Sequence, residues 1–80
     1  MPRAFLFMKL DAGSENEILQ RLRFIPEVME AYFVYGAYDM VARIDADSKA
    51  SLKKLVSSKI KSDKVRSILV ELVKEPKAPT

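Results

Sequence analysis

The sequence predicts an α+β domain in which a four-stranded antiparallel sheet carries two helices on one face. Two observations lead to this prediction. Short runs rich in apolar and β-branched residues, typical of strands, alternate with two longer segments whose apolar residues recur at helical spacing. The chain has 80 residues, the size of one small domain. We therefore expect a single domain over residues 1–75, followed by a flexible tail at 76–80.

The chain opens with a strand and a helix. Residues 4–10 are almost continuously apolar, which favours a buried central strand. Ser14 and Glu17 have the spacing of a capping box, in which the Ser14 hydroxyl accepts from the Glu17 amide and the Glu17 side chain reaches back. An amphipathic helix is predicted over 15–25, and Pro26 ends it because the residue before proline avoids helical backbone angles. The expected buried stripe is Ile18, Leu22 and Ile25.

The next two strands form a predicted hairpin. Residues 28–35 are rich in aromatic and β-branched residues, and a further strand is expected over 40–46. Residues 36–39, Gly-Ala-Tyr-Asp, form a connection so short that the two strands must pair antiparallel. Alternation along the second of these strands places on one face Met40, Ala42 and Ile44.

A second helix and a last strand complete the predicted domain. Ser48 and the two aspartates before it suit the start of a helix, and the lysines up to Lys64 suit its end. Lys59 falls close to the buried stripe, so we expect its charged end to reach out to solvent. The last strand is predicted from Val65 to about Lys74. The buried stripe of the helix is expected to contain Leu52, Leu55, Val56 and Ile60.

This order of elements is the ferredoxin-like β-α-β-β-α-β arrangement. Alternation gives the last strand two apolar faces, one with Ile68, Val70 and Leu72 and the other with Val65, Leu69 and Val73. The second strand likewise has two faces, one with Met29, Phe33 and Tyr35 and the other with Val28, Tyr32 and Val34. Because the helices cover only one face, a sheet that is apolar on both requires a second cover. We expect a second copy of the chain to supply it, as a homodimer formed through the face opposite the helices.

The composition excludes several kinds of chemistry. The chain contains no His and no Cys, so zinc sites, disulfides and nucleophiles that depend on these residues are excluded within it. Two glycines are too few for a phosphate-binding glycine-rich loop. Hydrophobic residues make up 49% of the chain, yet no apolar run approaches the ~18 residues of a membrane span. We therefore expect a cytoplasmic protein that is not an enzyme, uses no metal or cofactor and does not bind a membrane.

The segment 25–41 contains Gly-Ala-Tyr-Asp eight residues after Val28, and it resembles the signature of the effector domain of Lrp/AsnC transcription regulators. This domain is also called the regulation of amino-acid metabolism (RAM) domain, and the resemblance extends over roughly residues 3–74. It implies dimers formed by sheet-against-sheet packing, often assembled into rings of dimers, with an amino acid bound between dimers. Carried over by position, the implied ligand-binding residues are Gly36, Ala37, Tyr38 and Asp39.

Regulators of this family normally carry an amino-terminal helix-turn-helix domain, whereas the first strand of this chain begins at about residue 3. The resemblance therefore implies a stand-alone effector domain that does not bind DNA directly and that can assemble with a full-length regulator. The chain departs from the family in its last strand, where threonines are often found three and five residues after the leading hydrophobic residue. Those positions hold Ile68 and Val70, so the usual hydroxyl groups are missing and the ligand stays unassigned.

Several of these residues also have purely structural interpretations. Gly36 suits a turn with positive φ as well as a ligand contact. Asp39 suits the capping of backbone amides as well as the binding of a ligand ammonium group, and Tyr38 suits an interface. The aromatic residues of 28–35 favour a core or dimer interface over a surface that stacks RNA bases, because 39–44 lacks the glycine and aromatic pattern of RNA-binding sheets.

The basic residues of the second helix indicate the main alternative function. Residues 49–66 contain seven basic residues and one acidic residue. Lys54 and Lys61 are predicted to stand opposite the buried stripe, with Lys49 and Lys53 beside it. Such a face is usually solvated, but a ferredoxin-like module could bind nucleic acid through it. A small ferredoxin-like enzyme is a second alternative, and its acid–base candidates would be Glu30, Asp39, Asp45 and the tyrosines.

Overall fold

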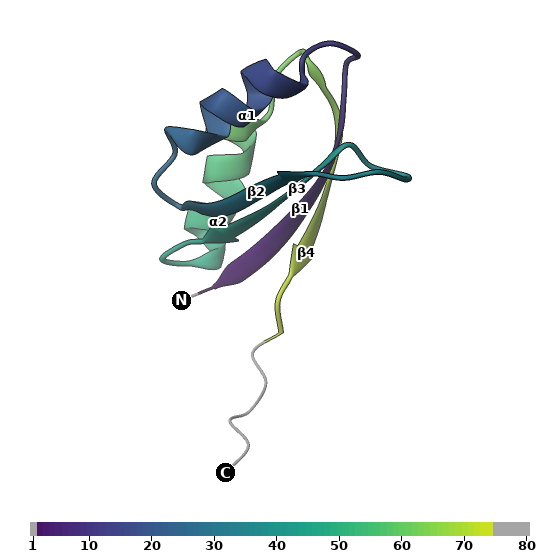
Figure 1. Ribbon diagram of the computed structural model, residues 1–80. Helices are drawn as coiled ribbons and strands as arrows, with labels where there is room; N and C mark the ends of the chain where they lie inside the picture. Colours follow the sequence, from purple (N-terminus) through teal and green to yellow (C-terminus); the bar gives the residue numbers. More distant parts are fainter. Residues whose placement is uncertain (1, 75–80) are drawn as a thin grey trace.

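The structure is a computed structural model that describes residues 2–74, so the predicted tail at 76–80 lies outside the described residues. The elements follow the predicted order (Figure 1). Their bounds are β1 Arg3–Leu10, α1 Glu15–Arg23, β2 Val28–Phe33, β3 Met40–Asp45, α2 Lys49–Leu55 with the π-helical segment η1 Val56–Ile60, and β4 Val65–Leu72. The sheet has the order β2-β3-β1-β4, and all neighbouring strands are antiparallel. The predicted ferredoxin-like fold is confirmed, although α1, β2 and β4 each end two residues earlier than predicted.

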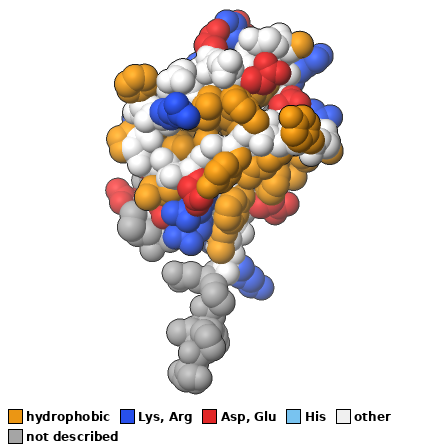
Figure 2. Space-filling view, viewed as in Figure 1, with side chains coloured by type: hydrophobic (Ala, Val, Ile, Leu, Met, Phe, Trp, Pro, Cys, Tyr) orange, Lys and Arg blue, Asp and Glu red, His pale blue; other side chains and the backbone are white. Residues whose placement is uncertain are grey.

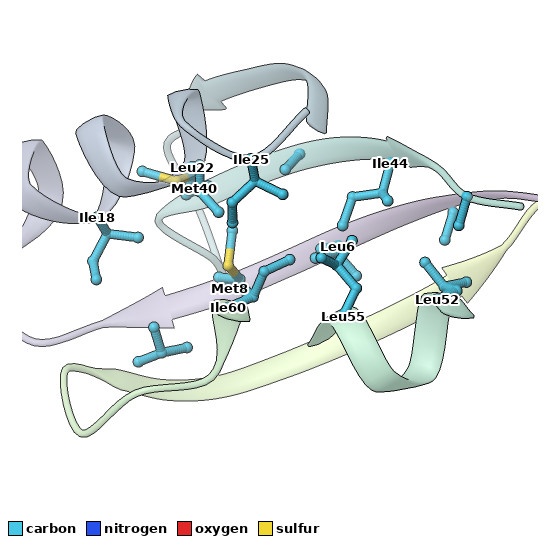
Figure 3. Close-up of a cluster of buried hydrophobic side chains, with 14 of the residues drawn as sticks. Leu6, Met8, Ile18, Leu22, Ile25, Met40, Ile44, Leu52, Leu55 and Ile60 are labelled. Carbon is cyan, nitrogen blue, oxygen red and sulfur yellow. The ribbon is translucent and has the colours of Figure 1, made fainter. Parts of the chain in front are cut away.

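The helices lie on one side of the sheet, and the core fills the space between the two layers (Figure 1). Because β1 is a central strand, its helix-facing side chains Leu6 and Met8 are fully buried. Figure 3 shows them grouped with Leu22 of α1 and Ile60 of η1. The predicted stripes of α1 and β3 are thus confirmed, and that of the second helix is confirmed except that Val56 is only partly buried. The core consists of Ala4, Leu6, Met8, Leu10, Ile18, Leu22, Ile25, Met40, Ala42, Ile44, Ala46, Leu52, Leu55, Ile60 and Val65.

The two helices begin differently, and the predicted capping box is wrong. Ser14 is the N-cap residue of α1, but its side chain accepts no hydrogen bond from the helix. The Ser14 hydroxyl instead donates to the Asp11 carbonyl at 2.6 Å, and the Ser14 amide donates to the same carbonyl at 3.1 Å. Ser14 therefore closes the turn after β1. At α2, by contrast, the Ser48 hydroxyl accepts from the Ser51 amide at 3.0 Å, as an N-cap should.

The second helix is not a continuous α-helix, and this explains the position of Lys59. A regular helical stripe through Leu52 would continue at Lys59. In η1, however, the Lys61 amide donates to the Val56 carbonyl at 2.9 Å, which is five residues back and defines a wider π-turn. The additional residue in this turn brings Ile60 into the core with 1% exposure, and Lys59 stays exposed.

A β-bulge changes the faces predicted for β2. Val28 pairs with Ile44, but the next pair joins Glu30 to Arg43, so Met29 is an additional residue without a counterpart on β3. Because directly opposite residues share a face, the bulge reverses the alternation after it. The predicted grouping of Val28 with Tyr32 is therefore wrong. By register, the helix side of β2 carries Val28, Ala31 and Phe33.

A second irregularity changes the face predicted for Val65. Lys9 pairs with Ser67 and Leu10 pairs with Val65, which leaves Arg66 as the additional residue of β4. Val65 is therefore on the helix side with 8% exposure, although alternation placed it on the other face. The predicted common face of Ile68, Val70 and Leu72 is confirmed, and pairing with β1 turns it toward the helices.

Candidate functional site

The predicted ligand-binding residues lie in the hairpin loop between β2 and β3, which projects from one end of the sheet (Figure 1). The Val34 amide donates to the Asp39 carbonyl at 3.0 Å and closes this loop. Gly36 has a φ of +127°, which residues with a side chain rarely adopt. Among the described residues, no atom beyond its chain neighbours comes within 4 Å of the position that a Cβ would take. Backbone conformation therefore explains glycine here, and Gly36 and Ala37 form an exposed tip.

Tyr38 and Asp39 attach this loop to β1. The Asp39 carboxylate Oδ2 accepts from the Leu10 amide at 2.8 Å, and the Asp39 amide donates to the Met8 carbonyl at 2.8 Å. The ring of Tyr38 packs on Phe7 with centroids 5.7 Å apart and a tilt of 55°. Asp39 thus caps a backbone amide, as its structural interpretation required, but the amide belongs to the neighbouring strand and not to the turn.

A groove of about 620 Å³ lies between β4 and the second helical segment, which consists of α2 and η1. Because β4 is an edge strand that the helices do not fully cover, Val70 and Leu72 remain 41% exposed. Ile68 and Val70, at the positions where the resemblance implied threonines, both line it. The groove was not predicted from the sequence, although the apolar face of β4 beside a short helix was an indication of it. The lining residues are Lys49, Leu52, Lys53, Val56, Ser57, Lys61, Val65, Arg66, Ser67, Ile68, Val70 and Leu72.

The charged groups that line this groove are all basic. Lys49 and Lys53 come from α2, Lys61 follows η1, and Arg66 lies at the bulge of β4. None of the lining residues in the described chain is an Asp or a Glu. The Arg66 Nε lies 3.7 Å from Asp11 Oδ1, whereas within residues 2–74 no ion pair is formed by the three lysines.

The basic residues of the second helix are divided between this groove and the surface outside it. Lys54 is exposed and lies outside the groove, whereas Lys61, predicted to stand opposite the buried stripe, lines it. Lys64 Nζ is 2.6 Å from Glu17 Oε1, and this hydrogen-bonded ion pair raises the pKa of Lys64.

The sheet face opposite the helices combines a group of apolar side chains with charged and polar ones. Phe5 is 36% exposed, Tyr32 is 56% exposed and Leu69 is 42% exposed. Figure 2 shows hydrophobic side chains gathered most densely over the strands. We call this surface the open face, and by register its apolar members are Phe5, Phe7, Tyr32, Val41 and Leu69.

A polar network occupies one end of the open face. Arg3 Nε and Nη2 donate to the two carboxylate oxygens of Asp45 at 2.9 and 3.3 Å. Arg43 Nη1 is 2.8 Å from Glu30 Oε2, and the Tyr32 hydroxyl also donates to Glu30. The hydrogen bond from Arg3 lowers the pKa of Asp45, and the bond to Glu30 raises the pKa of Tyr32. Two of the acid–base candidates of the enzyme alternative, Asp45 and Glu30, are thus each held in an ion pair with an arginine.

Comparison with known proteins assigns the family. A family model described as the Lrp/AsnC ligand binding domain matches residues 3–78, which is nearly the whole chain. The chain belongs to the Lrp/AsnC family. The resemblance that was based on the hairpin motif is therefore confirmed.

Relatives of this Lrp/AsnC domain include transcription regulators. It is 37% identical over 49 residues to the HTH-type transcriptional regulators FL11 of Pyrococcus horikoshii and Pyrococcus furiosus, which covers 61% of this chain and 32% of each regulator. The match thus spans about a third of those curated relatives. The crystal structure of FFRP-DM1 aligns with a TM-score of 0.89 and 33% identity over 92% of this chain and 100% of that one. Escherichia coli AsnC aligns with a TM-score of 0.86 and 26% identity over 99% of this chain and 55% of AsnC.

The Lrp/AsnC family is regulatory, and its curated relatives here are regulators of transcription. No helix within residues 2–74 is both long and apolar enough to cross a membrane. In the same part of the chain, no three acidic side chains come together in a way that could hold a metal ion. The features left to explain function are the hairpin, the groove and the open face.

Proposed function

We propose that this Lrp/AsnC domain binds a small-molecule effector, an amino acid or a related compound, where dimers of the chain meet. Binding would favour one assembly over another. The observation that carries the proposal is the match to a ligand-binding family in a chain with a groove of about 620 Å³. Small-molecule sites typically measure ~300–1,000 Å³. The effect on transcription would be indirect, through assembly with a full-length regulator of the same family.

The dimer proposed here forms through the open face. Its exposed Phe5, Tyr32 and Leu69 give an apolar surface whose burial contributes about 25 cal/mol per Å². We expect wild-type protein to sediment as a dimer or a larger assembly, and Leu69→Glu to shift it to the mass of a monomer. Phe24→Glu is the matched control, because Phe24 is 85% exposed at the end of α1 and lies off the open face. A Leu69→Glu protein that sediments like wild type would contradict this dimer.

A site between dimers is supported by the position of the two candidate regions. The hairpin connects β2 and β3, whereas the groove runs along β4 at the opposite edge of the sheet. Within one chain the central strand β1 lies between β3 and β4, and we propose that the hairpin of one copy meets the groove of another. The assembly would therefore complete the site.

Ligand-dependent assembly is the direct test of this function. Isothermal titration calorimetry with each common amino acid and its 2-oxo acid should find a binder, and the same compound should change the sedimentation coefficient. Ala37→Glu at the exposed hairpin tip should abolish that change and leave the dimer intact. Gln20→Glu on the exposed side of α1 adds the same charge and should have no effect. If no compound binds and none alters assembly, the proposal is wrong.

A further inference from the structure

We infer that the groove between the second helical segment and β4 binds an amphiphilic monoanion, with a hydrocarbon body, one carboxylate and no ammonium group. The inference rests on the proposed function, since it names the class of effector that this chain would sense. This class of effector differs from an amino acid, whose ammonium and carboxylate groups a binding domain would recognise together. Three features of the groove carry it.

The first feature is the apolar wall that β4 contributes. Ile68 and Val70 line the groove with hydrocarbon side chains that offer a ligand no hydrogen bond. Ser57, one of two serines in the lining, donates its hydroxyl to the Lys54 carbonyl at 3.1 Å. Val70 and Leu72 are 41% exposed and would gain from contact with an apolar ligand body. The apolar lining consists of Leu52, Val56, Val65, Ile68, Val70 and Leu72.

The second feature is the sign of the charges around that wall. Lys49, Lys53, Lys61 and Arg66 line the groove, and its described lining includes no carboxylate. Arg66 has Asp11 beside it at 3.7 Å, but the three lysines form no ion pair within residues 2–74. An ammonium group placed beside these lysines would meet like charges, whereas a carboxylate could form charge-assisted hydrogen bonds to one or more of them. The groove is therefore complementary to an anion and opposed to a zwitterion.

The third feature is the hydrogen bond that the hairpin carboxylate already accepts. Asp39 is the acidic residue of the family motif, and it would be the natural partner of a ligand ammonium group. Its Oδ2 already accepts from the Leu10 amide at 2.8 Å, so binding an ammonium through that oxygen would compete with a contact that holds the hairpin on β1. The fold thus supplies cations for a ligand carboxylate, whereas an ammonium bound at Asp39 Oδ2 would compete with a hydrogen bond that holds the hairpin.

Two matched pairs of compounds test the inference by isothermal titration calorimetry on the intact protein. Octanoate and octanamide differ in the negative charge, and 4-methyl-2-oxopentanoate and leucine differ in the ammonium group. The first compound of each pair should bind at least about tenfold more tightly than the second, because a charge-assisted hydrogen bond in one pair and a like-charge repulsion in the other separate them. Octanamide binding as tightly as octanoate, or leucine as tightly as its 2-oxo analogue, would overturn the inference.

Neighbouring lysines provide the matched variants. Lys53→Gln removes a cation from the groove, and we expect it to weaken octanoate binding about tenfold. Lys54→Gln removes the next charge along the helix, outside the groove, and should leave the affinity unchanged. Equal effects of the two substitutions would place octanoate elsewhere, for example on the open face, and would overturn the assignment.

The affinity order and the assembly state separate the two proposals. If leucine binds best and changes sedimentation, the proposed function stands and the ligand class inferred here is wrong. If octanoate binds in the groove with the expected order but no ligand changes assembly, the groove assignment stands and the proposed effector function is wrong. If octanoate does not bind at all, the inferred ligand class is wrong whatever the amino acids do.

Discussion

The hairpin and the groove lie at opposite edges of one sheet and are built from different interactions. The hairpin is fixed by its backbone and by Asp39, which takes part in three hydrogen bonds of 2.8 to 3.0 Å to Leu10, Met8 and Val34. The groove is bounded by apolar side chains and by lysines that form no ion pair within residues 2–74. The recognisable motif thus belongs to the region whose polar groups are engaged by the fold. The groups still available to a ligand lie where the sequence has no motif.

Replacing Asp39 tests this contrast most strongly. Asp39→Ala leaves the part-buried Leu10 amide without its acceptor, so we expect the free energy of unfolding to fall by about 1–3 kcal/mol in urea denaturation. Asp39→Asn keeps an acceptor oxygen and should retain most of the stability. A stable Asp39→Ala protein that no longer binds its ligand would move the ligand site to the hairpin and remove the contrast.

Gly36→Ala tests whether the hairpin tip needs its backbone conformation. At a φ of +127° an alanine is strained, and we expect a loss of about 1 kcal/mol, the lower end for strained residues because the exposed tip can relax. Ala37→Ser next to it should change stability by less than about 0.5 kcal/mol. Thermal denaturation of both proteins measures the difference, and equal melting temperatures would show that Gly36 is not required by the fold.

Introducing hydroxyls on β4 tests whether the apolar wall of the groove determines its ligand preference. The double variant Ile68→Thr and Val70→Thr changes side chains that are only partly buried, so we expect a stability change within about 1 kcal/mol. Its effect should appear in ligand preference, as a rise in the affinity for leucine relative to 4-methyl-2-oxopentanoate. Calorimetry on the variant and on wild type gives this ratio. An unchanged ratio would mean that these two positions do not contact the ligand.

The smallest expected effect is on stability at low pH. It concerns Asp45, which belongs to neither the hairpin nor the groove. Arg3 lowers the pKa of Asp45 in the folded state below the ordinary ~3.9 of an unfolded chain. Asp45 therefore contributes stability that is present above about pH 4 and is lost as the pH falls through its folded pKa. Urea denaturation at successive pH values should show that Asp45→Asn flattens this acid limb slightly. Ligand affinity at pH 7 should be unchanged in this variant.

The fold could be predicted because the hydrophobic pattern repeats through every element, from the alternation at Met40, Ala42 and Ile44 to the stripe at Ile18 and Leu22. The errors in assigning residues to faces have one physical origin. The bulges at Met29 and Arg66 and the π-turn in η1 each add a single residue, which a pattern of fixed period cannot represent. Lys59, which did not fit the predicted helical stripe, was the one visible sign of such an addition.

The candidate site was predictable only in part. The motif located the hairpin correctly, but it did not show that Asp39 hydrogen-bonds to Leu10, 29 positions away in sequence. The groove depends on how much of the edge strand the helices leave uncovered, as the 41% exposure of Val70 and Leu72 shows. That quantity is set by the packing of layers, and it is absent from any single stretch of sequence.

The π-turn has a consequence for how the chain tolerates changes in length. Deleting one residue from an ordinary helix rotates everything after it by about 100° and exposes the buried side chains. Deleting Ser58 should instead convert η1 to regular α-helix and keep the isoleucine at position 60 on the stripe that begins at Leu52. The segment thus behaves as an α-helix that has accepted one inserted residue, and the domain should survive its removal, whereas deletion of Gln20 from α1 should unfold it.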